Sequence, residues 1–269
     1  MSAHNLPAWL ELALTAARRA GAFLRQTAEA PIVVESELGR DVKLAADRGS
    51  EEIILRVLRE GSSLPILSEE MGLDDRQGAL SSLHWLVDPL DGSLNYLRGI
   101  PFCCVSIGLW DGPEPLLGVI YDFQREELFK GISGQGAWLN DQPMQVSATR
   151  EVGKAVLCTG FPVSTDFSPG AIRQFVEQVR RYKKLRLWGS AALSLAYVAA
   201  GRADSYYERD IKRWDVGAGL ALVRAAGGLT VQTASPQPFA LTVYAGNGSL
   251  PQLETLSSGQ GQAKYRELT

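Results

Sequence analysis

Acidic side chains follow several apolar, strand-like segments of this 269-residue chain. The acids at or near such positions are Asp47, Glu69, Glu70, Asp88, Asp91 and Asp215. Two carboxylates about 4 Å apart repel each other by about 1–4 kcal/mol at effective dielectric constants of about 80 to 20, so converging acids need a cation. Oxygen ligands from strand ends and turns suit Mg²⁺, which also keeps water and binds a phosphate of its substrate. The sequence therefore predicts a Mg²⁺ site.

The segment DPLDGSLN, residues 88–95, adds groups that suit a phosphate ester. A proline between Asp88 and Asp91 restricts the backbone, so both carboxylates can face the same ions. Gly92 lets the chain approach a ligand closely, and a helix that opens at Ser93 would present the amides of Gly92 and Ser93 to a phosphate. Taken alone, each fragment is also typical of an ordinary capped turn. Their combination with the other acids favours a phosphate site.

Other catalytic classes have no support in the sequence. The chain has no P-loop of the GxxxxGK type, no complete GxGxxG and no GxSxG, so ATP, NAD and serine-elbow chemistry are not indicated. Its two histidines, His4 and His84, are too few for a histidine-rich zinc site. His84 stands beside a tryptophan in a strand-like segment, which is typical of a packed residue.

Composition and charge bear on the binding partners and the cellular compartment of the protein. A formal net charge of −3 gives no overall attraction for nucleic acid or anionic membranes. The basic run RRYKKLR, residues 180–186, is more typical of a solvated helix end and turn than of a nucleic-acid patch. No signal peptide or membrane span is expected. Cys103, Cys104 and Cys158 lack CxxC spacing and predict buried, reduced thiols in the cytoplasm.

Apolar periodicity predicts the elements that must position these acids. Helices are expected at residues 6–28, from 50 onward, and at 169–182, 191–201 and 215–226. Strands are expected at residues 32–35, 64–68, 84–88, 102–110, 116–123, 126–131, 156–160, 204–208, 229–232 and 241–245. Residues 36–47 are expected to form a loop. Because helical and strand patterns mix without an internal repeat, we expect layers of helices and sheets.

The length predicts how these elements divide the chain. We expect a single two-lobed domain over residues 1–256, with sublobes of roughly 1–150 and 151–256. A final short helix is expected before a polar C-terminal tail at residues 257–269.

Two segments resemble the signatures of the inositol monophosphatase family. The run WLVDPLDGSLNYLRGIPFCCVSIGL, residues 85–109, is similar to the first signature, and WDVGAGLALVRAAGG, residues 214–228, to the second. DVKLAAD, SEE and RLWGSAALSLAYVAAGRADSYYE stand in the matching order, and the likeness extends from about residue 6 to 250. The resemblance implies a lithium-sensitive, Mg²⁺-dependent phosphatase. It also implies an α/β (α+β) fold, a layered α-β-α-β-α sandwich of the inositol monophosphatase and fructose-1,6-bisphosphatase type.

The resemblance also implies metal ligands. A first Mg²⁺ would be held by Glu69, Asp88 and the Leu90 carbonyl, and a second by Asp88, Asp91 and Asp215. A more weakly bound third ion near Glu69 would make two or three ions in all. The metals would act as Lewis acids and neutralise the leaving alkoxide during direct, in-line attack by water.

Catalytic and substrate-binding residues follow from the same resemblance. The catalytic candidates are Asp47, Ser93 and Glu69; Ser93 occupies a threonine position and would, with Asp47, orient and deprotonate the attacking water. Gly92 and Ser93 would bind the phosphate. The residues that match substrate-binding positions are Asp91, Arg186, Gly189, Ser190, Ala191 and Glu208. A carboxylate such as Glu208 accepts hydrogen bonds from hydroxyls, which suits a polyol.

Three positions depart from the family pattern. Leu44 replaces a threonine, Ser36 stands where a loop lysine is usual, and Ser93 replaces a threonine while it keeps the hydroxyl. Water activation is therefore expected to survive, and the affinity for a third ion is open. Lys43 is either a partial substitute for a cation or, more typically, a solvated lysine.

The expected activity is Mg²⁺-dependent hydrolysis of inositol 1-phosphate or a related polyol or sugar phosphate. Alternative substrates are fructose-1,6-bisphosphate, 3′-phosphoadenosine 5′-phosphate and histidinol phosphate, and a non-catalytic binding or regulatory protein is the alternative of another class. The resemblance implies a homodimer. The expected binding partner is a small phosphate ester, and binding to nucleic acid or to a membrane is not expected. The pair Tyr206-Tyr207 predicts strand packing, or one ring at the rim of the pocket.

Overall fold

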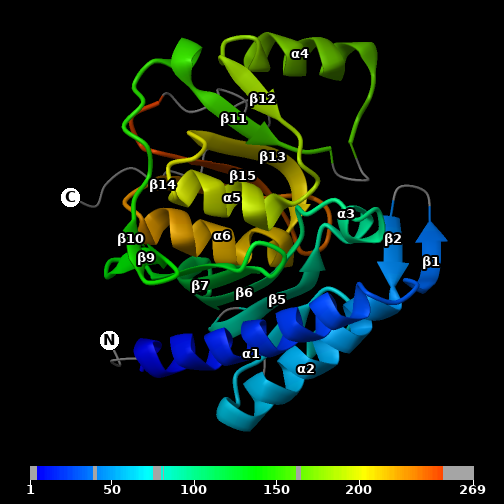
Figure 1. Ribbon diagram of the computed structural model, residues 1–269. Coiled ribbons are helices and arrows are strands. Elements are labelled where there is room, and N and C mark those ends of the chain that lie inside the picture. Colours follow the sequence, from blue (N-terminus) through cyan, green and yellow to red (C-terminus); the bar gives the residue numbers. More distant parts are fainter. Residues whose placement is uncertain (1–4, 39–40, 75–79, 81, 162–164, 251–269) are drawn as a thin grey trace.

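The fold stacks helices and sheets in alternating layers (Figure 1). The computed structural model describes residues 5–38, 41–74, 80, 82–161 and 165–250. Helices α1 (Leu6–Thr27) and α2 (Ala45–Gly61) cover one face of an eight-stranded sheet, and α5 (Ala191–Ala199) and α6 (Arg213–Ala225) separate this sheet from a five-stranded one. Helix α4 (Pro169–Val179) packs on the outer face of the second sheet. The predicted α-β-α-β-α arrangement is confirmed.

The larger sheet has the strand order β10-β9-β8-β7-β6-β5-β3-β4. Its strands are β3 (Ile66–Ser68), β4 (Gly72–Asp74), β5 (Leu83–Asp91), β6 (Cys104–Asp111), β7 (Glu114–Asp122), β8 (Glu127–Ile132), β9 (Gly136–Leu139) and β10 (Gln142–Met144). Strands β3 and β5 run parallel, with Ser68 beside Val87. The residues that follow β3 and those at the end of β5 therefore emerge at the same edge of the sheet.

The smaller sheet has the order β12-β11-β13-β15-β14. Its strands are β11 (Val156–Thr159), β12 (Lys184–Arg186), β13 (Ser205–Lys212), β14 (Leu229–Ala234) and β15 (Ala240–Gly246). The remaining elements are the hairpin β1 (Val34–Leu38) and β2 (Asp41–Leu44), the short helix α3 (Ser93–Leu97) and the 3-10 helix η1 (Val152–Lys154). Side chains alternate across this sheet, because Cys158 and Tyr206 pack toward α5 and α6 while Leu157 and Tyr207 pack on the α4 side.

Helix α6 approaches the larger sheet closely where glycines replace side chains. A Cβ atom on Gly118 would lie 2.2 Å from the Ala218 carbonyl oxygen, and one on Gly108 would lie 2.9 Å from the Ala218 nitrogen. Any larger residue at either position would push the helix away from the strands. These two glycines therefore fix the height of α6 above the sheet, and with it the position of Asp215 in the first turn of that helix.

The predicted loop over residues 36–47 is wrong. Strands β1 and β2 pair there as an antiparallel hairpin, which moves the first strand from the predicted 32–35 to Val34–Leu38. Helix α2 begins at Ala45 instead of residue 50, because the Leu44 N–H donates to Asp47 Oδ2 at 2.5 Å and so satisfies a backbone donor at the helix start. Asp47 therefore lies in the first turn of a helix.

Apolar patterning does not predict the short strands β4, β10 and β12. Their sequences GLD, QPM and KLR have no apolar run, and it is pairing with a neighbour that makes them strands. The end of RRYKKLR therefore forms an edge strand rather than a turn, and α4 ends at Val179 rather than at residue 182. The predicted final helix and the tail at residues 257–269 lie outside the described residues.

Several other expectations can be compared with the structure. The larger sheet uses residues 66–144 and the smaller one residues 156–246, while the lobe boundary near residue 150 stays a prediction. The three cysteines are buried free thiols, as predicted. His84 is a packed residue, as predicted, with Nδ1 2.7 Å from the Ser82 carbonyl oxygen. None of the helices in the described part of the chain combines the length and hydropathy that a membrane span needs.

Candidate active site

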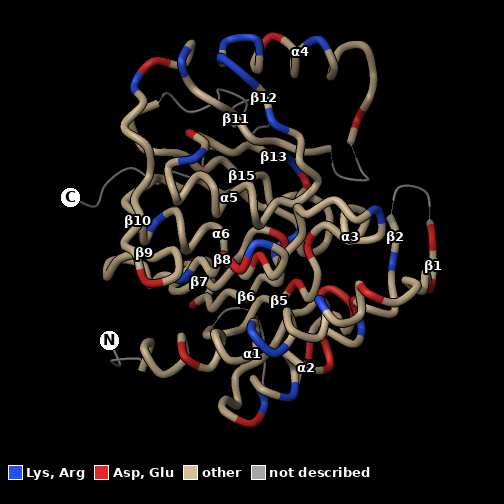
Figure 2. The backbone as a smooth tube through the Cα atoms, in the orientation of Figure 1, with Lys and Arg blue, Asp and Glu red and all other residues tan. Residues whose placement is uncertain are grey.

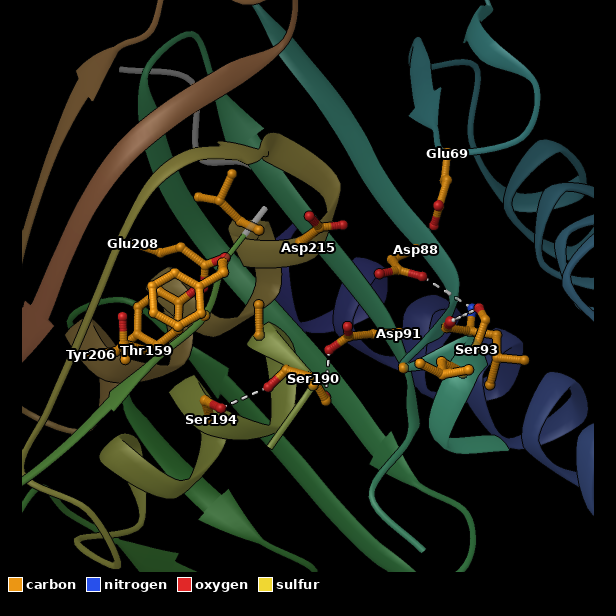
Figure 3. Close-up of a pocket in the computed structure, with 18 of the residues that line it drawn as sticks. Glu69, Asp88, Asp91, Ser93, Thr159, Ser190, Ser194, Tyr206, Glu208 and Asp215 are labelled. Atoms are coloured by element: carbon orange, nitrogen blue, oxygen red, sulfur yellow. Dashed lines mark hydrogen bonds between the residues drawn. The ribbon is translucent and has the colours of Figure 1, made fainter. Parts of the chain in front are cut away.

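A cavity of about 270 Å³ opens where the ends of β3 and β5 meet the first turns of α3, α5 and α6 (Figure 3). Its polar lining is Glu69, Asp88, Asp91, Ser93, Thr159, Ser190, Ser194, Tyr206, Glu208 and Asp215. These groups come from residues 69–93 and 159–215, which are far apart in the sequence, so the cavity exists only in the folded protein.

Three carboxylates converge at one side of this cavity. Glu69 follows β3, Asp88 lies in β5 and Asp215 lies in the first turn of α6, and ligand oxygens of all three lie within 4.8 Å of one another. Figure 3 shows the three side chains directed toward a common space. Parallel pairing of β3 with β5 continues through the Glu69 N–H, which donates to the Val87 carbonyl at 3.2 Å. This pairing brings Glu69 beside Asp88.

Burial and mutual repulsion disfavour the ionised form of these acids. Burial raises the pKa of Asp88 well above its usual value, and the neighbouring charges of Glu69 and Asp91 raise it further. The pKa of Asp215 is also raised well above its usual value, first by burial and then by Glu69 and Asp91. A cation among these oxygens would remove the repulsion, and an oxygen-only donor set fits Mg²⁺. The residues present therefore fit the predicted metal.

Asp91 occupies a different position from the other acids. Its Oδ2 accepts hydrogen bonds from the Ser190 hydroxyl at 2.5 Å and from the Ala192 N–H at 2.7 Å, at the start of α5. Burial raises its pKa to about 6, and these two hydrogen bonds oppose the rise. Asp91 lines the cavity but does not belong to the group of three within 4.8 Å. Its carboxylate therefore anchors α5 to β5.

The backbone that carries Asp88 and Asp91 is a bulged strand rather than the predicted turn. Both residues belong to β5, and its pairing with β6 shifts register between them. The Leu90 N–H donates to Asp88 Oδ1 at 3.1 Å inside this bulge. A bulge re-aims side chains locally, which lets both acids reach one cavity.

Ser93, which lines the cavity, forms a hydrogen bond with Asp47, which does not. The Ser93 hydroxyl lies 2.9 Å from Asp47 Oδ1 and 2.9 Å from the Leu90 carbonyl oxygen. Burial raises the pKa of Asp47 to about 7, although the Leu44 N–H and the Ser93 hydroxyl oppose the rise. Helix α3 begins at Ser93, as predicted. Ser93 lines the cavity, and Asp47 is reached through it.

Gly92 occupies a position where a side chain is not tolerated. Its φ of +89° lies in the left-handed region, and a Cβ there would lie 2.9 Å from the Phe102 carbonyl oxygen and 3.2 Å from that of Gly189. Gly189 itself has a φ of +71°. Backbone from α3 and from the start of α5 therefore meets closely at the wall of the cavity.

Glu208 lies across the cavity from the metal-binding candidates. The Tyr206 hydroxyl donates to Glu208 Oε2 at 2.6 Å, and burial raises the pKa of Glu208 to about 7. The ring of Tyr206 lines the cavity, so the expectation of one ring at the pocket is correct for Tyr206, while Tyr207 packs on the opposite face of the sheet. Sequence reasoning missed Gly160, on which a Cβ would lie 2.6 Å from Glu208 Oε2.

Neither of the two basic candidates lines the cavity. Lys43 Nζ binds both carboxylate oxygens of Glu70, at 2.9 and 2.8 Å, so Lys43 is not a simply solvated lysine. Arg186 lies on β12, where its guanidinium donates to the Leu185 carbonyl, and it is not among the residues that line the cavity. Figure 2 shows basic positions at β12, in the five-stranded sheet that α5 and α6 separate from the larger sheet.

Comparisons with known proteins agree with this architecture. The profile of the inositol monophosphatase family matches residues 5–259. An Escherichia coli protein named Nus factor SuhB is 36% identical over 246 residues, which are 88% of this chain and 91% of that protein. An inositol-1-monophosphatase from Synechocystis sp. is 36% identical over 258 residues, 93% of this chain and 88% of that protein.

Solved structures show the same relationship. The structure of an inositol monophosphatase from Anabaena (Nostoc) sp. superimposes with a TM-score of 0.79 at 38% identity, and the match covers 91% of this chain and 92% of that one. Since the family profile spans nearly the whole sequence and the fold agrees, this chain belongs to the inositol monophosphatase family.

Proposed function

We propose that the protein is a Mg²⁺-dependent phosphomonoesterase that hydrolyses inositol 1-phosphate, or a related polyol or sugar phosphate, by direct attack of water. The observation that carries this proposal is the convergence of Glu69, Asp88 and Asp215 within 4.8 Å of one another, in the same cavity as Ser93. Membership of the inositol monophosphatase family supports the phosphatase class.

The metal ions would be held by acids that line the cavity, together with one backbone carbonyl. Glu69, Asp88 and the Leu90 carbonyl are the proposed ligands of one Mg²⁺, and Asp88, Asp91 and Asp215 those of a second, with a third ion near Glu69. When bound, Mg²⁺ supplies Lewis-acid activation of water and stabilises the negative charge of the leaving oxygen. Asp91 can take this part only through Oδ1, because Oδ2 already serves the start of α5.

Ser93 and Asp47 would handle the proton of the attacking water. A water hydrogen-bonded to Ser93 Oγ can transfer its proton to the hydroxyl as the serine proton passes to Asp47 Oδ1. The raised pKa of Asp47, about 7, suits a group that accepts a proton near neutral pH. The amides of Gly92 and Ser93 are the proposed phosphate donors.

The other half of the cavity would bind the alcohol part of the substrate. Glu208, held by Tyr206, offers a carboxylate that accepts hydrogen bonds from ring hydroxyls. The other proposed substrate contacts are Asp91, Gly189, Ser190 and Ala191, which line the cavity. Arg186 stays a proposed contact from outside this lining.

A second candidate function is a binding or regulatory role. Relatives in Escherichia coli and Pasteurella multocida carry the name Nus factor SuhB, which is a reason to test for a role besides catalysis. The converging acids and the Ser93–Asp47 pair favour the enzyme, because a protein that only binds a macromolecule has no chemical need for them.

Phosphate release from a panel of substrates tests the proposal. The panel holds inositol 1-phosphate, fructose-1,6-bisphosphate, 3′-phosphoadenosine 5′-phosphate and histidinol phosphate, each with Mg²⁺ and with or without Li⁺. We expect inositol 1-phosphate to be hydrolysed fastest, Li⁺ to inhibit, and Asp91→Asn to be inactive. Lack of turnover of every ester, with Asp91→Asn indistinguishable from wild type, would favour the binding role instead.

Assembly and location are further expectations. We propose a cytoplasmic homodimer, on the family membership and the reduced, buried thiols. Light scattering on the purified full chain measures its mass in solution and tests the dimer.

A further inference from the structure

Helix α2 carries three buried polar side chains on the side that faces the acids. Asp47, Ser50 and Glu51 have the spacing i, i+3 and i+4, which puts them on the same face of the helix. They are 4%, 0% and 7% exposed, respectively. Buried polar groups need partners, since an unpaired one costs about 1–3 kcal/mol. Apart from the Leu44 N–H, which bonds Asp47 at the start of the helix, the partners of these three side chains are in segments next to the candidate metal ligands.

Two of the three hold the segment that runs from β5 into α3. The Ser50 hydroxyl donates to the Pro89 carbonyl at 2.7 Å, inside the bulge between Asp88 and Asp91. Asp47 receives the hydrogen bond from Ser93 just beyond it. Helix α2 therefore fixes this segment at two points.

Glu51 holds the turn that carries Glu69. Its Oε1 accepts hydrogen bonds from the backbone N–H of Glu70 at 3.1 Å, from the backbone N–H of Met71 at 3.0 Å, and from the Ser68 hydroxyl. These donors stand on either side of Glu69 in the chain. The three hydrogen bonds therefore fix the direction in which the backbone leaves β3.

Glu69 is thus constrained from two sides. Its own N–H donates to the Val87 carbonyl and continues the pairing of β3 with β5, while the next two N–H groups point to Glu51 on α2. In this conformation the Glu69 carboxylate is directed at Asp88 and Asp215. A turn without these anchors would have several ways to place the side chain.

Packing alone does not require a carboxylate at position 51. Apolar residues of α2 such as Ile54 and Leu58 already pack this helix into the core formed with the sheet. A buried carboxylate is favourable only when its hydrogen bonds are made, and here the three donors belong to the short segment that leads from the end of β3 into the turn. The specific contribution of Glu51 is therefore the orientation of that turn.

We propose that Glu51 is a positioning residue of the metal site: from α2 it aims Glu69 at Asp88 and Asp215, and so raises the affinity for Mg²⁺ without touching the ion. The inference rests on the proposed function, because it takes Glu69 as a metal ligand. Outer partners of metal ligands typically change metal affinity or activity by about 10–100-fold when they are removed.

Calorimetric titration of the metal-free full chain with MgCl₂ tests this role, alongside kcat measured at rising Mg²⁺. We expect Glu51→Ala to weaken Mg²⁺ binding by about 10–100-fold, with kcat recovered at saturating Mg²⁺. Glu51→Gln keeps an acceptor oxygen in the same place and is expected to bind Mg²⁺ like wild type. The matched control is Arg59→Ala, which removes side-chain bonds from the same helix to Asp74 of β4 at 2.6 Å and to Met71 Sδ at 3.2 Å. It leaves the three backbone and hydroxyl bonds to Glu51 in place and is expected to leave Mg²⁺ affinity unchanged.

Unchanged Mg²⁺ binding by Glu51→Ala overturns the inference. So does an equal loss in Arg59→Ala, because a general loosening of the β3–β4 hairpin then suffices. If Glu51→Ala does not fold, Glu51→Asp replaces it, because this variant keeps the charge but draws the acceptor oxygen back by one methylene. Weak Mg²⁺ binding by Glu51→Asp together with wild-type Mg²⁺ binding by Glu51→Gln supports the positioning role. Equal Mg²⁺ affinities of the two variants exclude it. A wild-type protein that binds no Mg²⁺ removes the proposed function and, with it, this inference.

Discussion

The hydroxyl oxygen of Ser93 lies 2.9 Å from Asp47 Oδ1, which joins the first turn of α3 to the first turn of α2. The same hydroxyl also lies 2.9 Å from the Leu90 carbonyl oxygen, and its single proton can serve only one of the two acceptors at a time. Asp47 is buried, with a pKa raised to about 7. Ser93 therefore connects the cavity to a carboxyl group that can take up a proton near neutral pH.

Removal of this hydroxyl should affect turnover more than metal binding. We expect Ser93→Ala to lower kcat by about 10²–10⁴-fold, because the proton path to Asp47 is lost, and to leave Mg²⁺ affinity close to wild type. Ser93→Thr keeps a hydroxyl at this position and should therefore keep activity. Ser194→Ala is the control, since that hydroxyl lines the cavity but bonds the Ser190 carbonyl within its own helix. A kcat for Ser93→Ala equal to that of the control contradicts the proton path.

Neutralising one of the convergent acids should separate metal binding from stability. We expect Asp215→Asn to weaken Mg²⁺ binding strongly and yet to raise the Tm of the metal-free protein, because a buried charge that repels Glu69 and Asp91 is removed. Differential scanning calorimetry with and without Mg²⁺ measures both effects.

The control for that variant is Asp204→Asn. Asp204 is a buried aspartate that accepts hydrogen bonds from the Ser147 hydroxyl at 2.6 Å and the Val156 N–H at 2.7 Å, outside the cavity. Its replacement should lower the Tm and leave Mg²⁺ affinity unchanged. A metal-free Tm that falls in Asp215→Asn as much as in Asp204→Asn would show that repulsion among the acids is not a cost to the fold.

Local patterns predict the acids that follow apolar strands. Glu69 directly follows the apolar run LPILS, and Asp88 directly follows WLV. Both acids can be located from the sequence, because a buried strand is marked by consecutive apolar residues. Asp47 could be found as a candidate but not as a helical residue, since α2 starts early only through the hydrogen bond of Leu44 to Asp47 and the β1–β2 hairpin before it.

Long-range contacts determine the rest of the site. The bond from Ser190 to Asp91 joins residues 99 positions apart, and no local pattern indicates that Asp91 anchors α5. Gly160 is needed because Glu208, from another strand, lies against it. A sequence shows which side chains are present, but the distances that give these two residues their roles arise only when β5, β11 and β13 have packed.

Two buried acids outside the group of three should contribute to the pH dependence of the stability of the metal-free protein. The pKa values of Asp47 and Glu208 are raised to about 7 from the ordinary 3.8 and 4.5, chiefly by burial. The folded state therefore binds these protons more tightly than the unfolded chain does. The resulting stability is fully present below about pH 4, where both states are protonated, and is lost by about pH 7, where the folded state also ionises. We expect the metal-free Tm to fall between about pH 4 and about pH 7.

Mg²⁺ should restore more stability at the upper end of this range than at the lower, because its charge favours the ionised acids. Scanning fluorimetry at constant ionic strength, with and without Mg²⁺, measures the effect. The double variant Asp47→Asn and Glu208→Gln removes two of the titrating groups and should make the metal-free profile shallower, because Asp88, Asp91 and Asp215 still titrate. A metal-free Tm that rises steadily over the same range contradicts the assignment.

A methyl group at position 160 should disturb substrate binding and leave the metal site intact. The added Cβ of Gly160→Ala would lie 2.6 Å from Glu208 Oε2, so the carboxylate has to move from the place where Tyr206 holds it. We expect KM for inositol 1-phosphate to rise by about tenfold, the equivalent of one lost hydrogen bond of about 1.4 kcal/mol, with Mg²⁺ affinity unchanged. Gly153→Ala is the control, because a Cβ there meets no atom within 4 Å. p-Nitrophenyl phosphate has no ring hydroxyls for Glu208 to bind, so both variants and wild type should hydrolyse it with the same KM. A higher KM for this ester in Gly160→Ala would contradict a role of Glu208 in binding the alcohol part of the substrate.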